Sequence, residues 1–240
     1  MAKPSKLPEK IAKLHAALSE KSFAIKDIKF IDPKGSRPLH YWISLNLVGN
    51  HAPDENDNSS NWVKFSFYEF IWILVIRRLK ELNYDNDILK ENAKSVFTKQ
   101  EEDLRMLAFE KAVITALTVR NAPVLLFFGL NGEFDVKYDV EGIASILFND
   151  HDGLYTQTNV YRFVREFLCV KQFLPYIKEN GLLEDREIQA LEVLYNNPKA
   201  EIGIRVENKP EIIIKPGESA VQEFISTIML EKYSGISIRL

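Results

Sequence analysis

The chain has 240 residues, 46% of them hydrophobic, which is enough apolar material for more than one compact unit. A net charge of −3 gives the chain as a whole no signature of a nucleic-acid-binding protein. One cysteine, Cys169, excludes an intramolecular disulfide and a multi-cysteine zinc cluster. No signal peptide is visible, and the longest apolar run, Phe70–Ile76, is too short to cross a bilayer, so we expect a cytoplasmic protein that does not enter a membrane.

The charge is divided unevenly along the chain. Residues 1–100 contain 16 Lys and Arg against 12 Asp and Glu, a net charge of +4, which leaves −7 for residues 101–240. A basic front half and an acidic rear half are typical of a DNA-binding module joined to a partner or sensor module. Uneven surface charge without a function has the same appearance.

Residues 1–21 are expected to form a basic N-terminal arm and a short helix. Ile11, Leu14 and Leu18 recur at helical spacing. The neighbouring lysines are Lys10, Lys13 and Lys21. They either contact phosphates or belong to an ordinary solvated helix face.

The segment Phe23–Val48 has the pattern of two short helices separated by a sharp turn, Asp32-Pro33-Lys34-Gly35. Ser36 is a suitable N-cap for the second helix, and Pro38 lies in its first turn, where the missing N–H costs little. The apolar positions of the second helix are Leu39, Trp42, Ile43 and Leu47, and its polar face carries Arg37, His40, Tyr41 and Ser44. This pattern is typical of a helix-turn-helix, whose second helix enters the major groove of DNA.

This segment and its continuation resemble the N-terminal DNA-binding domain of the MerR family. That family begins with an aromatic residue and an isoleucine, matched by Phe23 and Ile25. Leu-Arg-Tyr-Trp follows the isoleucine at a fixed distance, matched without a gap by Leu39-His40-Tyr41-Trp42. The family's third helix opens with Tyr-Ser-x-x-Asp-Leu and continues through Ile-Arg-Arg-Leu, matched by Phe65–Phe70 and Ile76–Leu79.

The resemblance implies a winged helix-turn-helix domain over residues 22–98 that binds double-stranded DNA. Arg37 would read bases, and Tyr41 and Lys34 would fix the register on phosphates. The residues assigned to DNA are Lys34, Ser36, Arg37, His40, Tyr41, Lys26 and Lys64.

Three features depart from the family. His40 stands where the family has an arginine, Lys26 stands where it has a glycine, and the expected wing at 50–61 is enlarged and acidic. These departures weaken the expected DNA contact more than the expected fold.

After the wing, Trp62–Phe65 is expected to form a short strand, and Ser66 with Glu69 forms a capping box at the start of the third helix. This helix is apolar nearly all round, so it needs cover on both sides, from the rear half of the chain or from a partner subunit. Asp85 is expected to cap a fourth helix that ends near Phe97.

Residues 99–178 are expected to form a connecting helix and a small α+β module. The helix, residues 99–120, takes the place of the family's long dimerising helix, but Asn121-Ala122-Pro123 stops it early. The module begins with a buried strand at Val124–Phe128 and a hairpin turn at Asn131-Gly132. Its further elements are short strands at Ile143–Phe148 and Leu154–Thr156 and an amphipathic helix that Asn159 caps.

Residues 179–240 contain a repeat. Ala190–Val206 and Phe224–Leu240 each consist of a helix end, a polar turn and Ile-x-Ile-Arg followed by Val or Leu. They predict two pseudo-symmetric helix–strand units. The second strand pairs either within the chain, with Ile202–Val206 or Ile212–Lys215, or with a strand of another chain.

The predicted fold class is α+β, an N-terminal winged helix-turn-helix followed by a helix and small mixed α/β modules. The sequence contains no Walker loop, dinucleotide fingerprint, HExxH or Gly-x-Ser-x-Gly, so we assign no catalytic residue and expect no enzyme. Asp150-His151-Asp152 is either a metal pair or, as we prefer, a polar turn, so no metal or cofactor is assigned.

The leading interpretation is a DNA-binding transcriptional regulator that forms a homodimer through the region after residue 98. The alternative is a protein-interaction or adaptor module on a winged-helix scaffold that has lost DNA binding.

Overall fold

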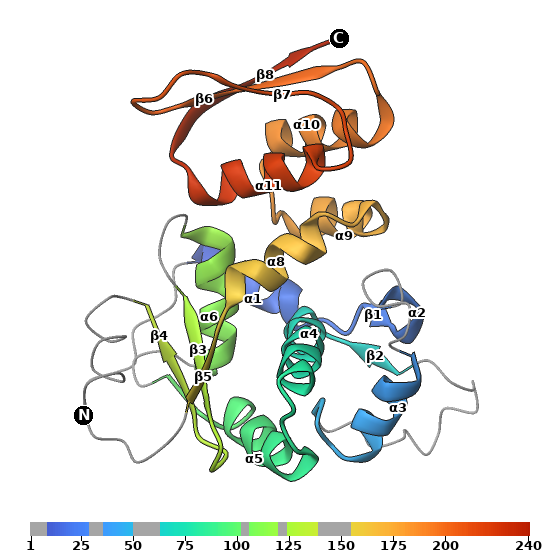
Figure 1. Ribbon diagram of the computed structural model, residues 1–240, viewed down its shortest axis with the longest axis vertical. Helices are drawn as coiled ribbons and strands as arrows, with labels where there is room; N and C mark the ends of the chain where they lie inside the picture. Colours follow the sequence, from blue (N-terminus) through green and yellow to red (C-terminus); the bar gives the residue numbers. More distant parts are fainter. Residues whose placement is uncertain (1–8, 29–35, 50–62, 102–105, 120–123, 139–154) are drawn as a thin grey trace. The chain divides into compact units, whose positions relative to one another are not determined.

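The computed structural model describes residues 9–28, 36–49, 63–101, 106–119, 124–138 and 155–240, with the main chain alone at Lys10, Ile28, Ser36 and Arg37 (Figure 1). The chain divides into two compact units. The N-terminal unit comprises Met1–Ala116 and Pro123–Phe163, and the C-terminal unit comprises Leu117–Ala122 and Val164–Leu240. Both combine helices with small antiparallel sheets, which confirms the mixed α and β composition of the predicted fold class.

The N-terminal unit contains a two-stranded sheet, β1-β2, and a three-stranded sheet of order β4-β3-β5, with helices around them. The last residues of two of its helices, α6 and α8, are assigned to the C-terminal unit. Its described elements are α1 (Glu9–Ser19), β1 (Phe23–Ala24), α2 (Ile25–Ile28), α3 (Ser36–Ser44), β2 (Lys64–Phe65), α4 (Phe67–Glu81), α5 (Asn86–Val96), α6 (Ala108–Thr118), β3 (Leu125–Gly129), β4 (Phe134–Lys137), β5 (Tyr155–Asn159) and α8 (Val160–Leu168).

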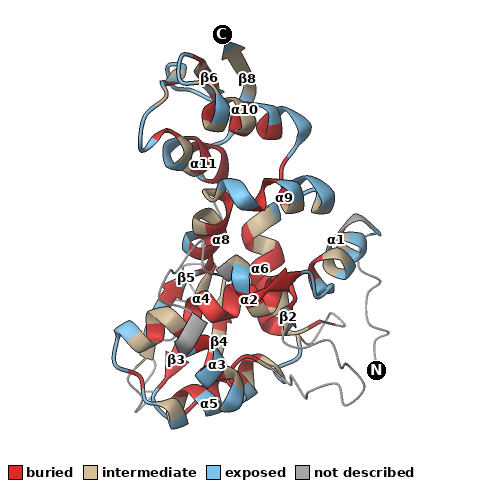
Figure 2. Cartoon of the chain, turned by 90° about the vertical axis from the view of Figure 1, so that its right-hand side faces the viewer, coloured by how far each residue is buried: buried red, intermediate tan, exposed pale blue. Residues whose placement is uncertain are grey.

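Helix α4 is the buried centre of the N-terminal unit (Figure 2). The predicted capping box is confirmed, because the Ser66 hydroxyl accepts from the Glu69 N–H and the Glu69 carboxylate accepts from the Ser66 N–H. Trp72 is fully buried, with ring centroids 5.9 Å from Phe109 and 5.8 Å from Phe128. The rear half of the chain therefore contributes to the cover of α4, and the residues of its second apolar face, Ile71, Leu74 and Val75, are buried within the chain and not left open for a partner subunit.

Helices α2 and α3 lie where the two helices within residues 23–48 are expected, although α3 ends at Ser44, before the expected apolar position Leu47, and the turn between them lies outside the described residues. Strand β1 pairs with β2, with Phe23 opposite Phe65, and the Phe23 ring stacks on Phe70 at 4.8 Å. This ladder fixes the start of α2 against α4. On α3, Leu39 and Trp42 are buried at the helical spacing expected of an apolar face. The wing at 50–61 lies outside the described residues, so a winged helix stays a prediction.

The predicted hairpin after residue 124 is confirmed. Strand β3 pairs antiparallel with β4 on one side and with β5 on the other. Gly132 adopts a φ of 84° in the turn, and a Cβ atom there would lie 2.3 Å from the Glu91 Cβ of α5, so both conformation and space require glycine. The strand expected at Ile143–Phe148 lies outside the described residues. Helix α8 begins where predicted, with the Asn159 side chain accepting from the Tyr161 N–H.

The prediction of one helix over residues 99–120 is wrong, because α6 begins only at Ala108. Residues before it form a local bridge between Gln100 and Leu107. The Glu110 carboxylate accepts from the Leu107 N–H and so satisfies a donor at the start of the helix. The helix in this region is thus shorter than expected. At α5, Asp85 is the N-cap residue, but its side chain makes no capping hydrogen bond.

In the C-terminal unit, two helices cover one face of a three-stranded sheet of order β7-β6-β8 (Figure 1). Its strands include both Ile-x-Ile segments of the sequence repeat, and these pair antiparallel with each other within the chain. The predicted helix–strand units are therefore α10 with β6 and α11 with β8. The described elements are η1 (Lys171–Phe173), α9 (Leu174–Asn180), α10 (Asp185–Asn196), β6 (Glu201–Val206), β7 (Ile212–Ile214), α11 (Ala220–Leu230) and β8 (Tyr233–Arg239).

Substitution of Trp72 tests the central position of α4. We expect Trp72→Ala to lower the free energy of unfolding by about 3–5 kcal/mol, because it leaves a cavity among aromatic side chains. The Trp72 indole N–H donates to the Leu47 carbonyl at 2.6 Å. Trp72→Phe should therefore cost about 1–3 kcal/mol, since it leaves a buried acceptor without its donor. Urea unfolding followed by far-UV circular dichroism measures both values.

The control is Leu130→Ala at a side chain that is 46% exposed, which should change the free energy of unfolding by less than about 0.5 kcal/mol. Equal effects of Trp72→Ala and Leu130→Ala would contradict the central role of Trp72.

Candidate nucleic-acid interface

Helix α3 has one buried and one exposed face. Leu39 and Trp42 point into the N-terminal unit, whereas His40 and Ser44 are exposed and Tyr41 is 53% exposed. Arg37 occupies a position of the same exposed face by helical spacing, and its side chain lies outside the described atoms. An exposed polar helix face on a packed scaffold is the geometry that groove binding needs.

The structure places two other predicted site residues next to this helix pair. Lys26 is exposed on α2, and Lys64 is exposed on β2. The β1-β2 register puts Lys64 opposite Ala24, two residues before Lys26, so the ladder brings the two lysine-bearing segments together. Ser36 starts α3, with only its main chain described, and Lys34 lies outside the described residues.

A series of hydrogen bonds that the sequence analysis did not identify connects the exposed face of α3 to a neighbouring part of the N-terminal unit. The Tyr41 hydroxyl accepts from the Asn86 side-chain amide at 3.2 Å, and the Asn86 side-chain oxygen accepts from Lys80 at 3.2 Å. Lys80 also donates to the Tyr84 carbonyl at 2.8 Å. These contacts join α3 to the turn between α4 and α5. No sequence signal could have found the link between Tyr41 and Asn86, because it joins residues far apart in the chain.

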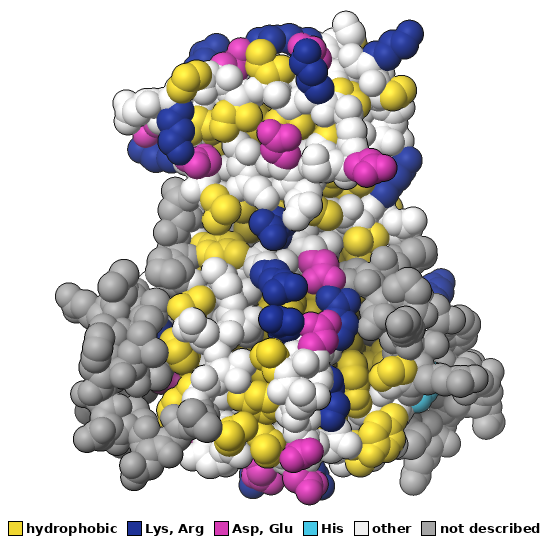
Figure 3. All heavy atoms as spheres, viewed as in Figure 1, with side chains coloured by type: hydrophobic (Ala, Val, Ile, Leu, Met, Phe, Trp, Pro, Cys, Tyr) yellow, Lys and Arg dark blue, Asp and Glu magenta, His cyan; other side chains and the backbone are white. Residues whose placement is uncertain are grey.

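Two cations on α1 and α4 of the N-terminal unit are already paired with carboxylates. Arg78 lies 2.8 Å from Glu81, and Lys13 lies 2.7 Å from Glu9. On the face seen in Figure 3, Lys and Arg side chains are interspersed with Asp and Glu. Exposed pairs of this kind contribute at most about 1 kcal/mol, so a phosphate could replace the carboxylate at little cost.

A hollow of about 210 Å³ lies where α1, α4, α5 and α6 meet. Its acidic side chains, Glu69 and Glu110, each accept from a main-chain N–H at the start of a helix. Glu110 also lies 3.1 Å from His15, and Glu69 lies 3.7 Å from Lys21. These carboxylates therefore serve the helix ends that line the hollow.

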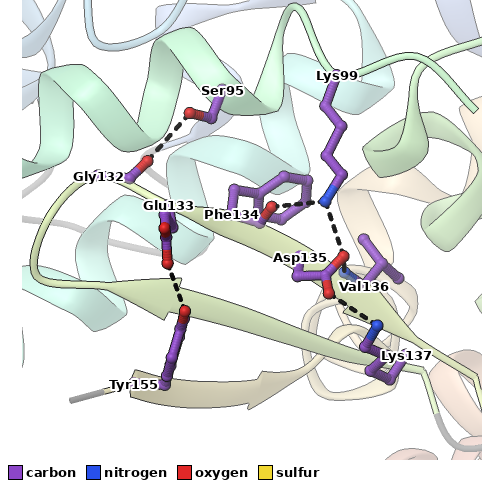
Figure 4. Close-up of polar contacts among 9 residues, drawn as sticks. All are labelled: Ser95, Lys99, Gly132, Glu133, Phe134, Asp135, Val136, Lys137 and Tyr155. Atoms are coloured by element: carbon purple, nitrogen blue, oxygen red, sulfur yellow. Dashed lines mark hydrogen bonds and ion pairs between the residues drawn. The ribbon is translucent and has the colours of Figure 1, made fainter. Parts of the chain in front are cut away.

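A second polar cluster fastens the β3–β4 hairpin to α5 (Figure 4). Lys99 donates to the Phe134 carbonyl at 2.9 Å and to the Asp135 carboxylate at 2.7 Å, and Lys137 lies 2.8 Å from the other Asp135 oxygen. Ser95 donates to the Gly132 carbonyl at 3.0 Å. Burial raises the pKa of Asp135, but hydrogen bonds from Lys137 and Lys99 outweigh it, so the pKa lies below its usual value of 3.8.

Among the described residues we find neither a cluster of metal ligands nor a reactive thiol. Among them, no group of three or more His, Cys, Asp and Glu side chains is arranged to hold a metal ion, and Asp150-His151-Asp152 lies outside them. Burial raises the pKa of Cys169 to about 11, which keeps the thiol protonated and a poor nucleophile at neutral pH. Within the described part of the chain, no helix has both the length and the apolar character needed to span a membrane.

The Asp135 cluster gives the unit a pH-dependent contribution to stability. A carboxyl whose pKa is lower in the folded state stabilises the fold above its unfolded pKa, and this contribution disappears as the pH falls through the folded pKa. The difference in unfolding free energy between the wild type and Asp135→Asn should therefore shrink as the pH falls from about 6 to about 2.

Urea unfolding at a series of pH values measures this difference, and Asp87→Asn, at an exposed aspartate of α5, is the matched control. A difference for Asp135→Asn that stays constant over this pH range would refute the proposed linkage.

Comparisons with known proteins add no relative to this description. No family model matches the chain. No curated protein and no solved structure matches it either.

Proposed function

We propose that this protein is a DNA-binding transcriptional regulator that reads DNA with α3. The observation that carries the proposal is the division of α3 into a buried apolar face and an exposed polar one. The pairing of β1 with β2 supports it, because it holds the helix pair to α4 next to two exposed lysines. The resemblance of residues 22–97 to the MerR family points to the same use of this segment.

In this proposal, residues of α3 and its surroundings have different tasks. Arg37 contacts base edges, because a guanidinium can donate two hydrogen bonds to guanine. Tyr41, Lys34 and Ser36 position the helix on the phosphates, and the Asn86 contact fixes the ring of Tyr41 before DNA arrives. His40 lies on the same face as Tyr41. Lys26 and Lys64 contribute sequence-independent attraction to the phosphate backbone.

One short recognition helix reads few base pairs, so a regulator of this size would act as a homodimer on palindromic half-sites. The two recognition helices would then lie one helical turn of DNA apart. Of the two dimer surfaces that the sequence suggested, the second side of α4 is buried within the chain. The edge of β8 is therefore the remaining candidate for the dimer surface.

The second candidate function is a protein-interaction module. It is favoured by one observation, namely that the Tyr41 hydroxyl on the exposed face of α3 already has a partner within the chain. Selection of bound duplexes from a random DNA pool distinguishes the two functions. Enrichment of one motif supports the regulator, and no enrichment at low salt supports the interaction module.

Arg37→Ala should weaken binding to the selected duplex by about 1–3 kcal/mol and relax the preference at one position of the motif. Fluorescence anisotropy with the selected duplex and with single-base variants measures both effects. The matched control is Arg205→Ala, at an exposed arginine of the C-terminal unit. Equal affinities of Arg37→Ala and wild type for the selected duplex would exclude Arg37 from base readout.

Lys64→Ala should weaken binding to selected and random duplexes by the same factor, because a phosphate contact carries no sequence information. The slope of log affinity against log salt concentration should fall by about 1, since one fewer phosphate is neutralised. Titration of the salt concentration checks this slope, with Lys199→Ala, at an exposed lysine of the C-terminal unit, as the control. A loss confined to the selected duplex would assign Lys64 to base readout instead.

A further inference from the structure

Strand β8 pairs with β6, and the sequence of β6 is a near copy of its own. Ile202 lies opposite Ile238, Gly203 opposite Ser237, and Ile204 opposite Ile236. Gly203 and Ser237 are equivalent positions of the sequence repeat, so the two-fold relation of the repeat runs between them. The segment Ile-Ser-Ile-Arg of β8 is therefore already seen to accept Ile-Gly-Ile-Arg as an antiparallel neighbour.

The two edges of this sheet are protected to different degrees. At one edge, β7 has only three residues, lies between Pro210 and Pro216, and is flanked by Lys209 and Lys215. Short length, proline and lysine are the usual means of closing a strand edge. At the other edge, β8 has seven residues and contains neither proline nor lysine. Among the described residues, no strand pairs with its outer edge.

The apolar row on the helix-covered face is incompletely buried at β8. Ile202 and Ile204 in the central strand are 0% exposed, whereas their repeat equivalents, Ile236 and Ile238, are only half-buried. The difference arises because β6 has a neighbour on both sides and β8 has one. A further strand on the outer edge of β8 would extend the row and cover both isoleucines.

One main-chain carbonyl at the outer edge of β8 already accepts a hydrogen bond from a side chain. The Arg186 Nε of α10 donates to the Ile236 carbonyl at 3.3 Å, in an exposed contact. Neighbouring residues of an antiparallel strand direct their main-chain groups to opposite edges. The main-chain groups of Ile236 and Ile238 therefore face outward, while those of Ser237 face β6. Replacing this long, exposed hydrogen bond by a main-chain hydrogen bond from an added strand has a small net cost in free energy.

We propose that β8 pairs with β8 of a second copy of this chain, antiparallel and with the two-fold axis at Ser237. The two three-stranded sheets then form one continuous sheet. Ile236 lies opposite Ile238 of the second copy, and Gly235 opposite Arg239 of the second copy, so along β8 no charge meets a like charge. Arg239 keeps its ion pair with Glu211 at 2.7 Å.

The second copy is the preferred occupant because its strand reproduces the side-chain pairs that β8 already makes with β6. The inference rests on the homodimer of the proposed function and deepens it by naming the surface. Its tests contain no DNA, so that loss of DNA binding and loss of the dimer are observed separately.

Disulfide cross-linking tests the register. Ser237→Cys in a Cys169→Ser background places two thiols at a pair without mutual main-chain hydrogen bonds, with Cα atoms about 4.5 Å apart, within the range that a disulfide spans. Mild oxidation should convert most of this variant into a covalent dimer. The matched control, Ile213→Cys in the same background, puts a thiol on β7, where the native side chain is 45% exposed, and should form no covalent dimer.

A charge variant tests the same edge without cysteine. The full wild-type chain at tens of micromolar should be a dimer by light scattering. Ser237→Lys sets two ammonium groups opposite each other at the axis and should weaken the dimer at least tenfold, whereas Ile213→Lys should leave it unchanged. Far-UV circular dichroism confirms that both variants fold. A monomeric wild type, or a dimer that Ser237→Lys does not weaken and Ser237→Cys does not cross-link, would overturn the proposal.

Discussion

The N-terminal unit depends on the burial of α4 from both sides. A helix that is apolar nearly all round must exclude water over its whole circumference, and Trp72 does this for two sides at once. Its ring packs against Phe109 and Phe128, and its indole N–H reaches the Leu47 carbonyl just beyond α3. Segments from both halves of the sequence therefore become one core, and the position of α3 follows from that core.

The polar contacts have a smaller energetic role but decide what the surface can do. The caps at Ser66 and Glu110 satisfy helix ends that would otherwise lack hydrogen-bond partners. The contact between Tyr41 and Asn86 ties an exposed side chain of α3 to α5.

The C-terminal unit shows how a repeat produces asymmetry as well as symmetry. Its two helix–strand units are joined through Gly203 and Ser237, and a Cβ atom at residue 203 would lie 2.4 Å from the Ser237 hydroxyl and 2.6 Å from the Glu211 carboxylate. Glycine therefore lets Glu211 reach Ser237 and Arg239 across the central strand. The link between the repeats supplies β7 on one side only, so the two ends of the sheet differ.

The sequence by itself determined the local elements. The capping box at Ser66, the hairpin turn at Gly132 and the start of α8 at Asn159 were predictable, because caps, turns and helical spacing depend on neighbouring residues. Only the tertiary structure decided which surfaces remain open. The burial of α4 by the rear half, the late start of α6 and the link from Tyr41 to Asn86 depend on contacts between distant residues, which leave no periodic signal in the chain.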